Sequence, residues 1–278
     1  MKTTCQVCVH HCALSPGQTG LCGARKNEDG TIICSNYGQI TSMALDPIEK
    51  KPLKHFRPGS RILSVGSYGC NLRCPFCQNH EISMAREADA DTLYVTPEQL
   101  ADTALEWKER RDGKNIGIAY TYNEPLTGWE FVRDTSRLVK KYGMDNVLVT
   151  NGTASLNVLE ELLPYIDAMN IDLKGFRQDY YHMLGGDFET VKAFITRAVK
   201  DCHVELTTLI VPGENDSLDE MREEARWIAE LNPDIPLHIT RFFPQYHMSD
   251  RNPTNVKQLY RLAEAAGQYL RNVHIGNI

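Results

Sequence analysis

From residue 61 onward, the chain repeats a pattern of a short apolar run, a polar loop and an amphipathic stretch whose apolar positions lie three or four residues apart. Six of the apolar runs predict strands, at residues 61–67, 115–120, 145–150, 167–172, 203–210 and 235–241, and a short further strand is predicted at 273–276. Runs such as Ile62-Leu63-Ser64-Val65 are typical of parallel strands that are buried on both faces.

The stretches between these strands predict helices. One begins at Thr96, where Thr96 and Gln99 have the spacing of a capping box and Pro97 occupies the first helical position. Another begins at Ser217, with Glu220 at the corresponding place. Further helices are predicted at residues 129–142, 155–163, 189–201 and 254–270.

Strands that alternate with helices indicate parallel βα units joined by right-handed crossovers. Six units are fewer than the eight of a complete barrel. We therefore predict an α/β fold in the form of a partial (β/α)6 barrel, with a doubly wound open sheet as the alternative. Because residues 1–60 do not follow the repeat and are rich in Cys and Gly, we expect a small Cys-rich N-terminal metal-binding lobe at 1–60 and the barrel at 61–278.

Composition narrows the class of protein. Hydrophobic residues make up 42% and charged residues 24%, as in ordinary globular proteins. The formal net charge of −6 argues against nucleic acid as the main partner, since phosphate binding depends on clustered Lys and Arg. No apolar run approaches the roughly 20 residues of a membrane span, and the N-terminus has no signal-peptide pattern. We expect a cytoplasmic protein with no membrane partner.

Nine cysteines are many for such a protein, and seven of them fall into two tight groups. Clustered cysteines in a reducing compartment more often bind metal or act in redox chemistry than form disulfides. The first group to consider is Cys70, Cys74 and Cys77, which directly follow the first barrel strand. Three thiolates at this spacing can ligate three irons of a cubane and leave the fourth iron open, whereas an electron carrier normally closes its cluster with four cysteines.

Two alternatives remain open for this group of cysteines. A structural zinc site needs four ligands, so His80 or a distant residue would have to supply the last one. A thioredoxin-like redox pair could be formed by Cys74 and Cys77, but this leaves Cys70 without a role.

The pattern Cys-x3-Cys-x-aromatic-Cys, with Phe76 in the aromatic position, resembles the signature of the radical S-adenosylmethionine (SAM) superfamily. The resemblance implies a partial barrel of the radical SAM type with a [4Fe–4S] cluster on Cys70, Cys74 and Cys77. It also implies that SAM is cleaved reductively to methionine and a 5′-deoxyadenosyl radical, which abstracts hydrogen from a substrate.

Polar segments follow the barrel strands, at the ends where parallel barrels carry their chemistry. The resemblance implies that Asn123-Glu124-Pro125 replaces the family's Gly-Gly-Glu segment, so that Glu124 holds the methionyl ammonium of SAM. It implies ribose or carboxylate contacts for Asn151, Asp172, Lys174 and His238, and places Phe76 and residues 209–211 beside the adenine.

Each polar segment could also have a purely structural role. Glu124 could begin a helix, Asn151-Gly152 could be a plain turn, and Asp172 and Lys174 could simply form an ion pair. Because polar strand ends are common in α/β folds, a single such segment does not indicate a site. A functional role is favoured because polar segments recur after successive strands.

The second group, Cys5, Cys8, Cys12 and Cys22, offers four thiolates. Four thiolates suffice for a structural zinc ion or for a second iron–sulfur cluster, and His10 or His11 could substitute for one of them. The isolated Cys34 and Cys202 are expected to be small buried hydrophobic residues.

Residues 20–25, 46–53 and 55–56 (Gly-Leu-Cys-Gly-Ala-Arg, Asp-Pro-Ile-Glu-Lys-Lys-Pro-Leu and His-Phe) resemble the radical SAM component of the AmmeMemoRadiSam system. That group is similar to pyruvate formate-lyase activating enzymes. The resemblance implies a protein substrate, with activation of a glycyl radical enzyme as the leading reaction, and a flavodoxin- or ferredoxin-type electron donor. The alternatives are radical modification of a peptide or small molecule, and a non-catalytic iron–sulfur electron carrier.

Members of the group continue beyond a Val-x-Ile-Gly-Asn segment into a further Cys-containing tail, whereas this sequence ends at Ile278. We expect any site in that tail to be absent here.

Overall fold

A computed structural model describes residues 1–110 and 114–278, and its centre is an eight-stranded sheet of order β14-β13-β12-β11-β10-β9-β7-β6. Seven of these strands are parallel: β7 (Arg61–Gly66), β9 (Asn115–Tyr120), β10 (Asp145–Thr150), β11 (Ala168–Asp172), β12 (His203–Ile210), β13 (Leu237–Arg241) and β14 (Val273–Gly276). The six predicted barrel strands and the short strand at 273–276 are thus confirmed, with ends that agree to within two residues.

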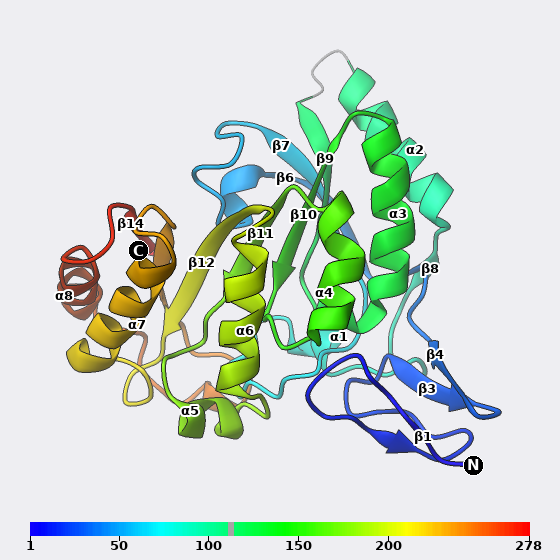
Figure 1. Cartoon of the computed structure of the whole chain (residues 1–278), viewed down its shortest axis with the longest axis horizontal. Helices are drawn as coiled ribbons and strands as arrows, with labels where there is room; N and C mark the ends of the chain where they lie inside the picture. Colours follow the sequence, from blue (N-terminus) through cyan, green and yellow to red (C-terminus); the bar gives the residue numbers. More distant parts are fainter. Residues whose placement is uncertain (111–113) are drawn as a thin grey trace.

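The helices that connect these strands are α2 (Pro97–Glu109), α3 (Trp129–Lys141), α4 (Leu156–Leu162), α6 (Phe188–Ala198), α7 (Leu218–Leu231) and α8 (Val256–Ala266). The parallel strands lie in the sheet in chain order, so right-handed crossovers bring the helices to one and the same face. Figure 1 shows α3, α4 and α6 on one side of the strands. A doubly wound sheet would carry helices on both faces, so the partial barrel is confirmed and the alternative was wrong.

Two helix starts test the predicted capping boxes. At Thr96 the box forms in full, because the side chains of Thr96 and Gln99 each accept the backbone N–H of the other residue. At Ser217 only half of it forms: the Ser217 hydroxyl accepts from the backbone of Asp219 and Glu220, whereas the Glu220 carboxylate accepts the N–H of Phe176 instead. The short helices α1 (His80–Ser83) and α5 (Gln178–Met183) were not predicted.

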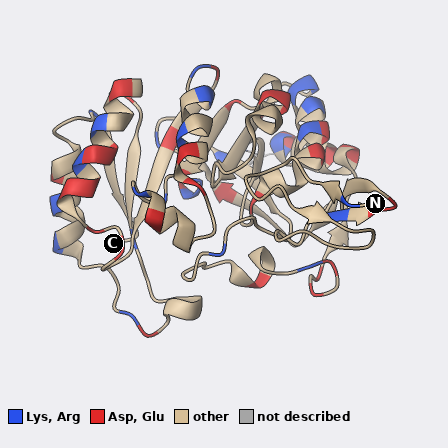
Figure 2. Ribbon diagram, turned by 60° about the horizontal axis from the view of Figure 1, so that its bottom comes forward, with Lys and Arg blue, Asp and Glu red and all other residues tan. Residues whose placement is uncertain are grey.

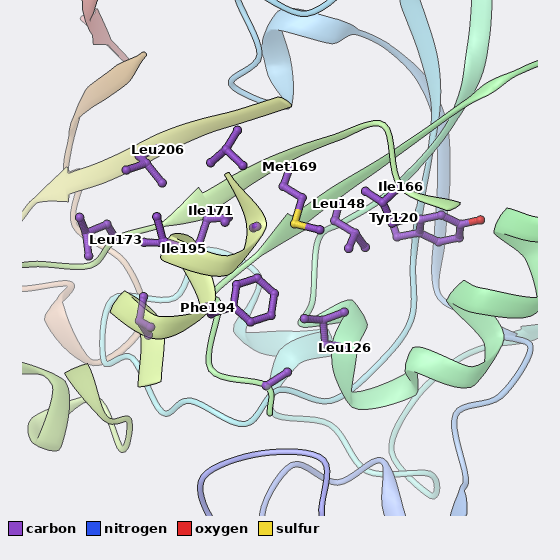
Figure 3. Close-up of a cluster of buried hydrophobic side chains, with 14 of the residues drawn as sticks. Tyr120, Leu126, Leu148, Ile166, Met169, Ile171, Leu173, Phe194, Ile195 and Leu206 are labelled. Carbon is purple, nitrogen blue, oxygen red and sulfur yellow. The ribbon is translucent and has the colours of Figure 1, made fainter. Parts of the chain in front are cut away.

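The main core lies between the outer face of the sheet and the helices. Figure 3 shows strand residues such as Leu148 and Met169 on one side and Phe194 of α6 on the other, all fully buried. These apolar contacts hold the helical layer to the sheet and fix the positions of the strand ends.

The inner face of the sheet is filled at its amino end by residues 46–53, a stretch to which the sequence pattern assigned no role. Ile48 of the short helix η1 (Ile48–Lys50) and Leu53 are both fully buried. They pack against inward-facing residues of four strands: Ile62, Ala119, Val147 and Ala168. We call residues 46–53 the plug, because they close the amino end of the partial barrel.

The first 60 residues contribute both to the sheet and to a set of small hairpins. Strand β6 (Ser42–Pro47) pairs antiparallel with β7 at the edge of the sheet. The hairpins are formed by β1 (Thr3–Thr4) with β2 (Ala13–Leu14) and by β3 (Arg25–Glu28) with β4 (Thr31–Cys34), and β5 (Gln39–Ile40) pairs with β8 (Leu93–Tyr94). Strand β6 thus belongs to the barrel sheet although it precedes residue 61. The division into an N-terminal lobe at 1–60 and a barrel at 61–278 stays a prediction.

A buried ion pair fastens the hairpins to the barrel. The guanidinium of Arg25 donates to both carboxylate oxygens of Glu130 in α3, at 2.6 and 2.7 Å.

The surface of the outer helices carries charges of both signs. Figure 2 shows Lys and Arg interspersed with Asp and Glu over these helices. Among the described residues, no helix is long and apolar enough to cross a membrane.

Candidate functional site

Cys70, Cys74 and Cys77 all lie on the loop of residues 67–79 between β7 and α1, which we call the cysteine loop. The backbone N–H of Cys70 donates to the carbonyl of Cys22 at 3.1 Å, and that of Cys77 donates to the carbonyl of Cys74 at 3.2 Å. Gly69 has φ +91°, and a Cβ there would lie 2.5 Å from the Cys22 carbonyl oxygen, so this position requires glycine.

The three cysteines pack into one apolar cluster at the carboxyl ends of the barrel strands. The other members of the cluster are Leu72, Phe76, Tyr180, Leu184, Leu209, Val211, Phe242 and Met248. Phe76 therefore lies in the same cluster as Leu209 and Val211, the residues expected to flank adenine.

Burial in this cluster changes the acidity of the thiols. It raises the pKa of Cys70 well above its usual value and that of Cys74 to about 11, and the neighbouring cysteines add to the shift at both positions. Because the thiolate is the form that binds metal, a cationic centre must deprotonate these groups when it binds. The hydroxyl of Tyr180, in the same cluster, is buried and has no hydrogen-bond partner among the described residues. Apolar surroundings with three thiols and this unpaired donor fit an iron–sulfur cluster.

Glu124 follows β9 and is almost fully buried. Its carboxylate accepts hydrogen bonds from the N–H of Leu126 at 3.0 Å, the hydroxyl of Thr150 at 2.7 Å and the N–H of Asn151 at 2.8 Å. Burial raises the pKa of Glu124 to about 7, although these three hydrogen bonds act in the opposite direction. Glu124 is also the N-cap of η2 (Pro125–Gly128), so it has the structural role as well.

Asn123 and Asn151 bring the ends of β9 and β10 to the cysteine loop. The Asn123 amide donates to the carbonyls of Tyr68 and Gly69, at 3.1 and 3.0 Å. The Asn151 amide donates to the side-chain oxygen of Asn71 at 2.9 Å and lies 3.8 Å from the sulfur of Cys70.

Asp172, the last residue of β11, and Lys174, just beyond it, form the ion pair that their spacing suggested, with 2.7 Å between Nζ and Oδ2. Burial opposes the charge of Lys174, but Asp172 and the nearby Cys74 raise its pKa. The positive charge of Lys174 acts in the opposite direction to burial on the pKa of Cys74.

His238 is not brought to the cysteine loop. It is the second residue of β13, and its Nε2 lies 2.7 Å from a carboxylate oxygen of Glu205 on β12. Glu205 also accepts the backbone N–H groups of Lys54 and His55, just beyond the plug. Position along the strand accounts for the difference: the residues that reach the loop lie at or beyond the carboxyl ends of their strands, whereas His238 lies near the amino end of β13.

His247 is a residue that the sequence analysis missed. It lies on the short helix η4 (Tyr246–Met248), and its backbone N–H donates to the carbonyl of Pro75 in the cysteine loop at 2.9 Å. The preceding Tyr246 stacks on His80, with 4.4 Å between the ring centroids. The available signal was the sequence Pro-Gln-Tyr-His directly after the last predicted barrel strand.

The four N-terminal cysteines line one cavity, together with His10 and Arg25. Cys5, Cys8 and Cys22 are buried and Cys12 is partly exposed. Burial raises the pKa of Cys8 to about 11 and that of Cys22 as well, while a backbone N–H of His10 and those of Ala24 and Arg25 donate to the two sulfurs.

This cavity adjoins the cysteine loop. The side chain of His10 lies 2.7 Å from the carbonyl oxygen of Asn71, and the Cys22 carbonyl accepts the N–H of Cys70. Within residues 1–110 and 114–278, no three His, Cys, Asp or Glu side chains are arranged as the ligands of one metal ion. Thiolates on a cubane bind different irons, so they need not converge on one point.

A partial parallel barrel with a three-cysteine loop and buried polar groups at the carboxyl ends of its strands defines an enzyme that binds its cofactors at that end of the barrel. The family model described as the Radical SAM superfamily matches residues 64–228, more than half of the chain. This chain belongs to the radical SAM superfamily and is an enzyme of the radical SAM type.

Several known proteins are similar to it. An uncharacterized protein of Methanocaldococcus jannaschii is 37% identical over 280 residues, covering 100% of this chain and 82% of that protein. A pyruvate formate-lyase-activating enzyme of Clostridium pasteurianum is 29% identical over 177 residues, covering 63% of this chain and 71% of that enzyme. The crystal structure of Streptococcus suis SuiB bound to S-adenosylmethionine has a TM-score of 0.57 at 14% identity, covering 75% of this chain and 48% of SuiB, and shares the fold.

Proposed function

We propose that Cys70, Cys74 and Cys77 hold a [4Fe–4S] cluster that binds SAM and, once reduced, cleaves it to methionine and a 5′-deoxyadenosyl radical. The observation that carries this proposal is the packing of all three cysteines into one apolar cluster at the strand ends, with the sulfur of Cys70 3.8 Å from the side-chain amide of Asn151. The unpaired hydroxyl of Tyr180 in the same cluster supports a bound group at this place.

The residues around the loop supply the contacts that SAM needs. The carboxylate of Glu124 binds the methionyl ammonium, and the ammonium of Lys174 binds the methionyl carboxylate, each by a charge-assisted hydrogen bond. Asn151 and Asp172 offer polar groups to the methionyl carboxylate and the ribose of SAM. Asn123 supports them through its hydrogen bonds to the cysteine loop. Phe76 and the Leu209–Val211 strand end provide an apolar face for adenine. Ile48 and Leu53 close the amino end of the barrel and so exclude water from that side of the site.

We propose a protein as the substrate, activated by abstraction of a hydrogen atom from a glycine. The name of the Clostridium pasteurianum relative, a pyruvate formate-lyase-activating enzyme, supports this choice. A flavodoxin- or ferredoxin-type carrier supplies the electron. Transfer of deuterium from a glycine-labelled glycyl radical enzyme into 5′-deoxyadenosine would test the substrate, and its absence would refute that part alone.

The four N-terminal cysteines hold a second metal centre in this proposal, either a structural zinc ion or a second iron–sulfur cluster. Their common cavity and the N–H groups that donate to the Cys8 and Cys22 sulfurs support it, because thiolate ligands are stabilised by such donors.

The central experiment is SAM cleavage by anaerobically reconstituted protein with dithionite as reductant. Wild-type protein and a Cys202→Ala control should release 5′-deoxyadenosine, whereas the variant with Cys70, Cys74 and Cys77 all replaced by Ala should not. Cys202 is a suitable control because it lies outside the site, its sulfur next to the carbonyl of Ala198. A wild-type protein that carries a full cluster but yields no 5′-deoxyadenosine would refute the proposal.

A further inference from the structure

The plug contains an ion pair, Asp46 with Lys51, that takes no part in the apolar packing that closes the barrel. Asp46 forms an ion pair with Lys51, whose Nζ lies 2.9 Å from Oδ2 of Asp46, and the Lys51 side chain is only 4% exposed. Ile48 and Leu53 supply the apolar packing of the plug, and an ion pair with a buried lysine adds little to stability. Closing the barrel therefore does not explain why Asp46 and Lys51 are present.

The ion pair holds the side chain of Tyr122. The Tyr122 hydroxyl donates to Oδ2 of Asp46 at 2.9 Å, and Lys51 Nζ lies 4.7 Å from the centre of the Tyr122 ring. Burial opposes the charge of Asp46, but the hydrogen bonds from Lys51 and Tyr122 lower its pKa, so Asp46 remains a charged acceptor. Tyr122 thus extends from the carboxyl end of β9 toward the plug.

The backbone of Tyr122 has a conformation that needs such an anchor. Its φ is +73°, in the left-handed region that aromatic residues seldom adopt. The ring packs against the last residue of β7, since a Cβ on Gly66 would lie 2.8 Å from Cδ2 of Tyr122. Held at both its ring and its hydroxyl, Tyr122 turns the chain sharply before Asn123 and Glu124.

This turn is bonded to both ends of the cysteine loop. The carbonyl of Tyr122 accepts the side-chain amide of Asn79 at 2.7 Å, two residues after Cys77. On the other side, Asn123 accepts the N–H of Ser67 at 3.0 Å, and the N–H of Glu124 donates to the carbonyl of Gly69, next to Cys70, at 3.3 Å.

We propose that Tyr122 is a positioning residue, anchored on the Asp46–Lys51 pair, that sets the distance between Glu124 and the cysteine loop and thereby the geometry in which SAM is bound. This inference rests on the proposed function, since it assumes that Glu124 holds the methionyl ammonium of SAM and that the cysteine loop holds the cluster to which SAM binds. It gives residues 46–53 a role beyond packing, as the support of the SAM-binding turn from inside the barrel.

The test compares Tyr122→Phe with Tyr142→Phe in reconstituted holoenzyme. Tyr142 makes the same kind of bond, from its hydroxyl to a carboxylate oxygen of Asp102 at 2.6 Å, but on the surface outside the site. Iron and sulfide content should match wild type in both variants. Anaerobic titration with SAM should show a Kd raised about tenfold or more in Tyr122→Phe, because a hydrogen bond to a charged group is lost, and within about twofold of wild type in Tyr142→Phe.

A second readout separates positioning from general stability. The change that SAM produces in the electron paramagnetic resonance spectrum of the reduced cluster should be altered in Tyr122→Phe and preserved in Tyr142→Phe. A Tyr122→Phe protein with wild-type affinity for SAM and a wild-type spectrum would overturn the inference while leaving the proposed function intact. Failure of the wild-type protein to bind SAM at all would instead refute the proposed function.

Discussion

The carboxylate of Glu124 accepts the backbone N–H of Asn151 at 2.8 Å, which joins the ends of β9 and β10 directly. Glu124 also caps η2, so one side chain both fixes two strand ends and presents a buried carboxylate beside the cysteine loop. Its structural role is therefore compatible with the cofactor-binding role proposed for it. A variant must be chosen so that the two can be separated.

Glu124→Gln should weaken SAM binding more than it destabilises the fold. The amide oxygen can still accept from Leu126 and Thr150, so two of the three structural hydrogen bonds are kept and only the one from the Asn151 N–H is lost. The negative charge proposed to bind the ammonium of SAM is lost completely. A charge-assisted hydrogen bond contributes about 1.5–3 kcal/mol, which corresponds to a Kd roughly 10- to 150-fold higher. Equilibrium binding of SAM under anaerobic conditions measures this directly.

Glu224→Gln is the matched control for that experiment. Glu224 is also a fully buried carboxylate, but it accepts a hydrogen bond from Thr208 between α7 and β12, outside the barrel. Its replacement should leave the Kd for SAM within about twofold of wild type. Equal losses of SAM affinity in the two variants would show that the effect of Glu124 is merely structural.

The raised pKa of Glu224 leads us to expect that the free energy of unfolding depends on pH. Burial raises its pKa from 4.5 to about 8 in the folded chain. Between these two values the folded state keeps a proton that the unfolded state has released, so the free energy of unfolding falls as pH rises through this range and levels off above pH 8.

Glu224→Gln should remove the part of this dependence that Glu224 causes, whereas Glu124, whose pKa is raised to about 7, keeps its own part. The variant should be the more stable protein at alkaline pH, by on the order of 1–3 kcal/mol. Urea unfolding at several pH values from about 5 to 9, compared between the two proteins, checks the prediction. Parallel pH profiles for wild type and variant would contradict it.

Local sequence patterns predicted the barrel well, because parallel strands such as residues 145–150 contain a short apolar run, here Val147-Leu148-Val149, between polar residues. The cysteine loop was equally visible, since its spacing is local. The position of His238 within its strand was not, and the prediction for it rested on resemblance alone. The plug could not be recognised either, because Leu53 and Ala168 meet only in the folded chain. Long-range contacts of this kind leave no periodic signal.

The plug gives a direct test of its own. Leu53→Ala should lower the free energy of unfolding by about 2–5 kcal/mol, because Leu53 is fully buried and its truncation leaves a cavity at the amino end of the barrel. Leu93→Ala, at a side chain that is 68% exposed, is the control and should change stability by less than about 0.5 kcal/mol. Indistinguishable urea midpoints for the two variants would show that residues 46–53 do not support the core.

The last prediction concerns the two proposed metal centres, whose cysteine segments are joined by the hydrogen bond from the Cys70 N–H to the Cys22 carbonyl. The variant with Cys70, Cys74 and Cys77 replaced by Ala should lose one cluster and keep the N-terminal metal, because the two sets of ligands belong to different segments. Four thiols that line one cavity supply enough ligands for this metal without any of the three loop cysteines.

Metal analysis of that variant, purified without oxygen, decides the identity of the second centre. About one zinc per chain would indicate a structural zinc ion, and residual iron with sulfide would indicate a second cluster. Additional replacement of Cys5, Cys8, Cys12 and Cys22 should then remove all bound metal, and it should lower stability, because a structural metal contributes folding free energy. If the triple variant holds no metal and its four N-terminal thiols are alkylated freely in the native state, the second centre does not exist.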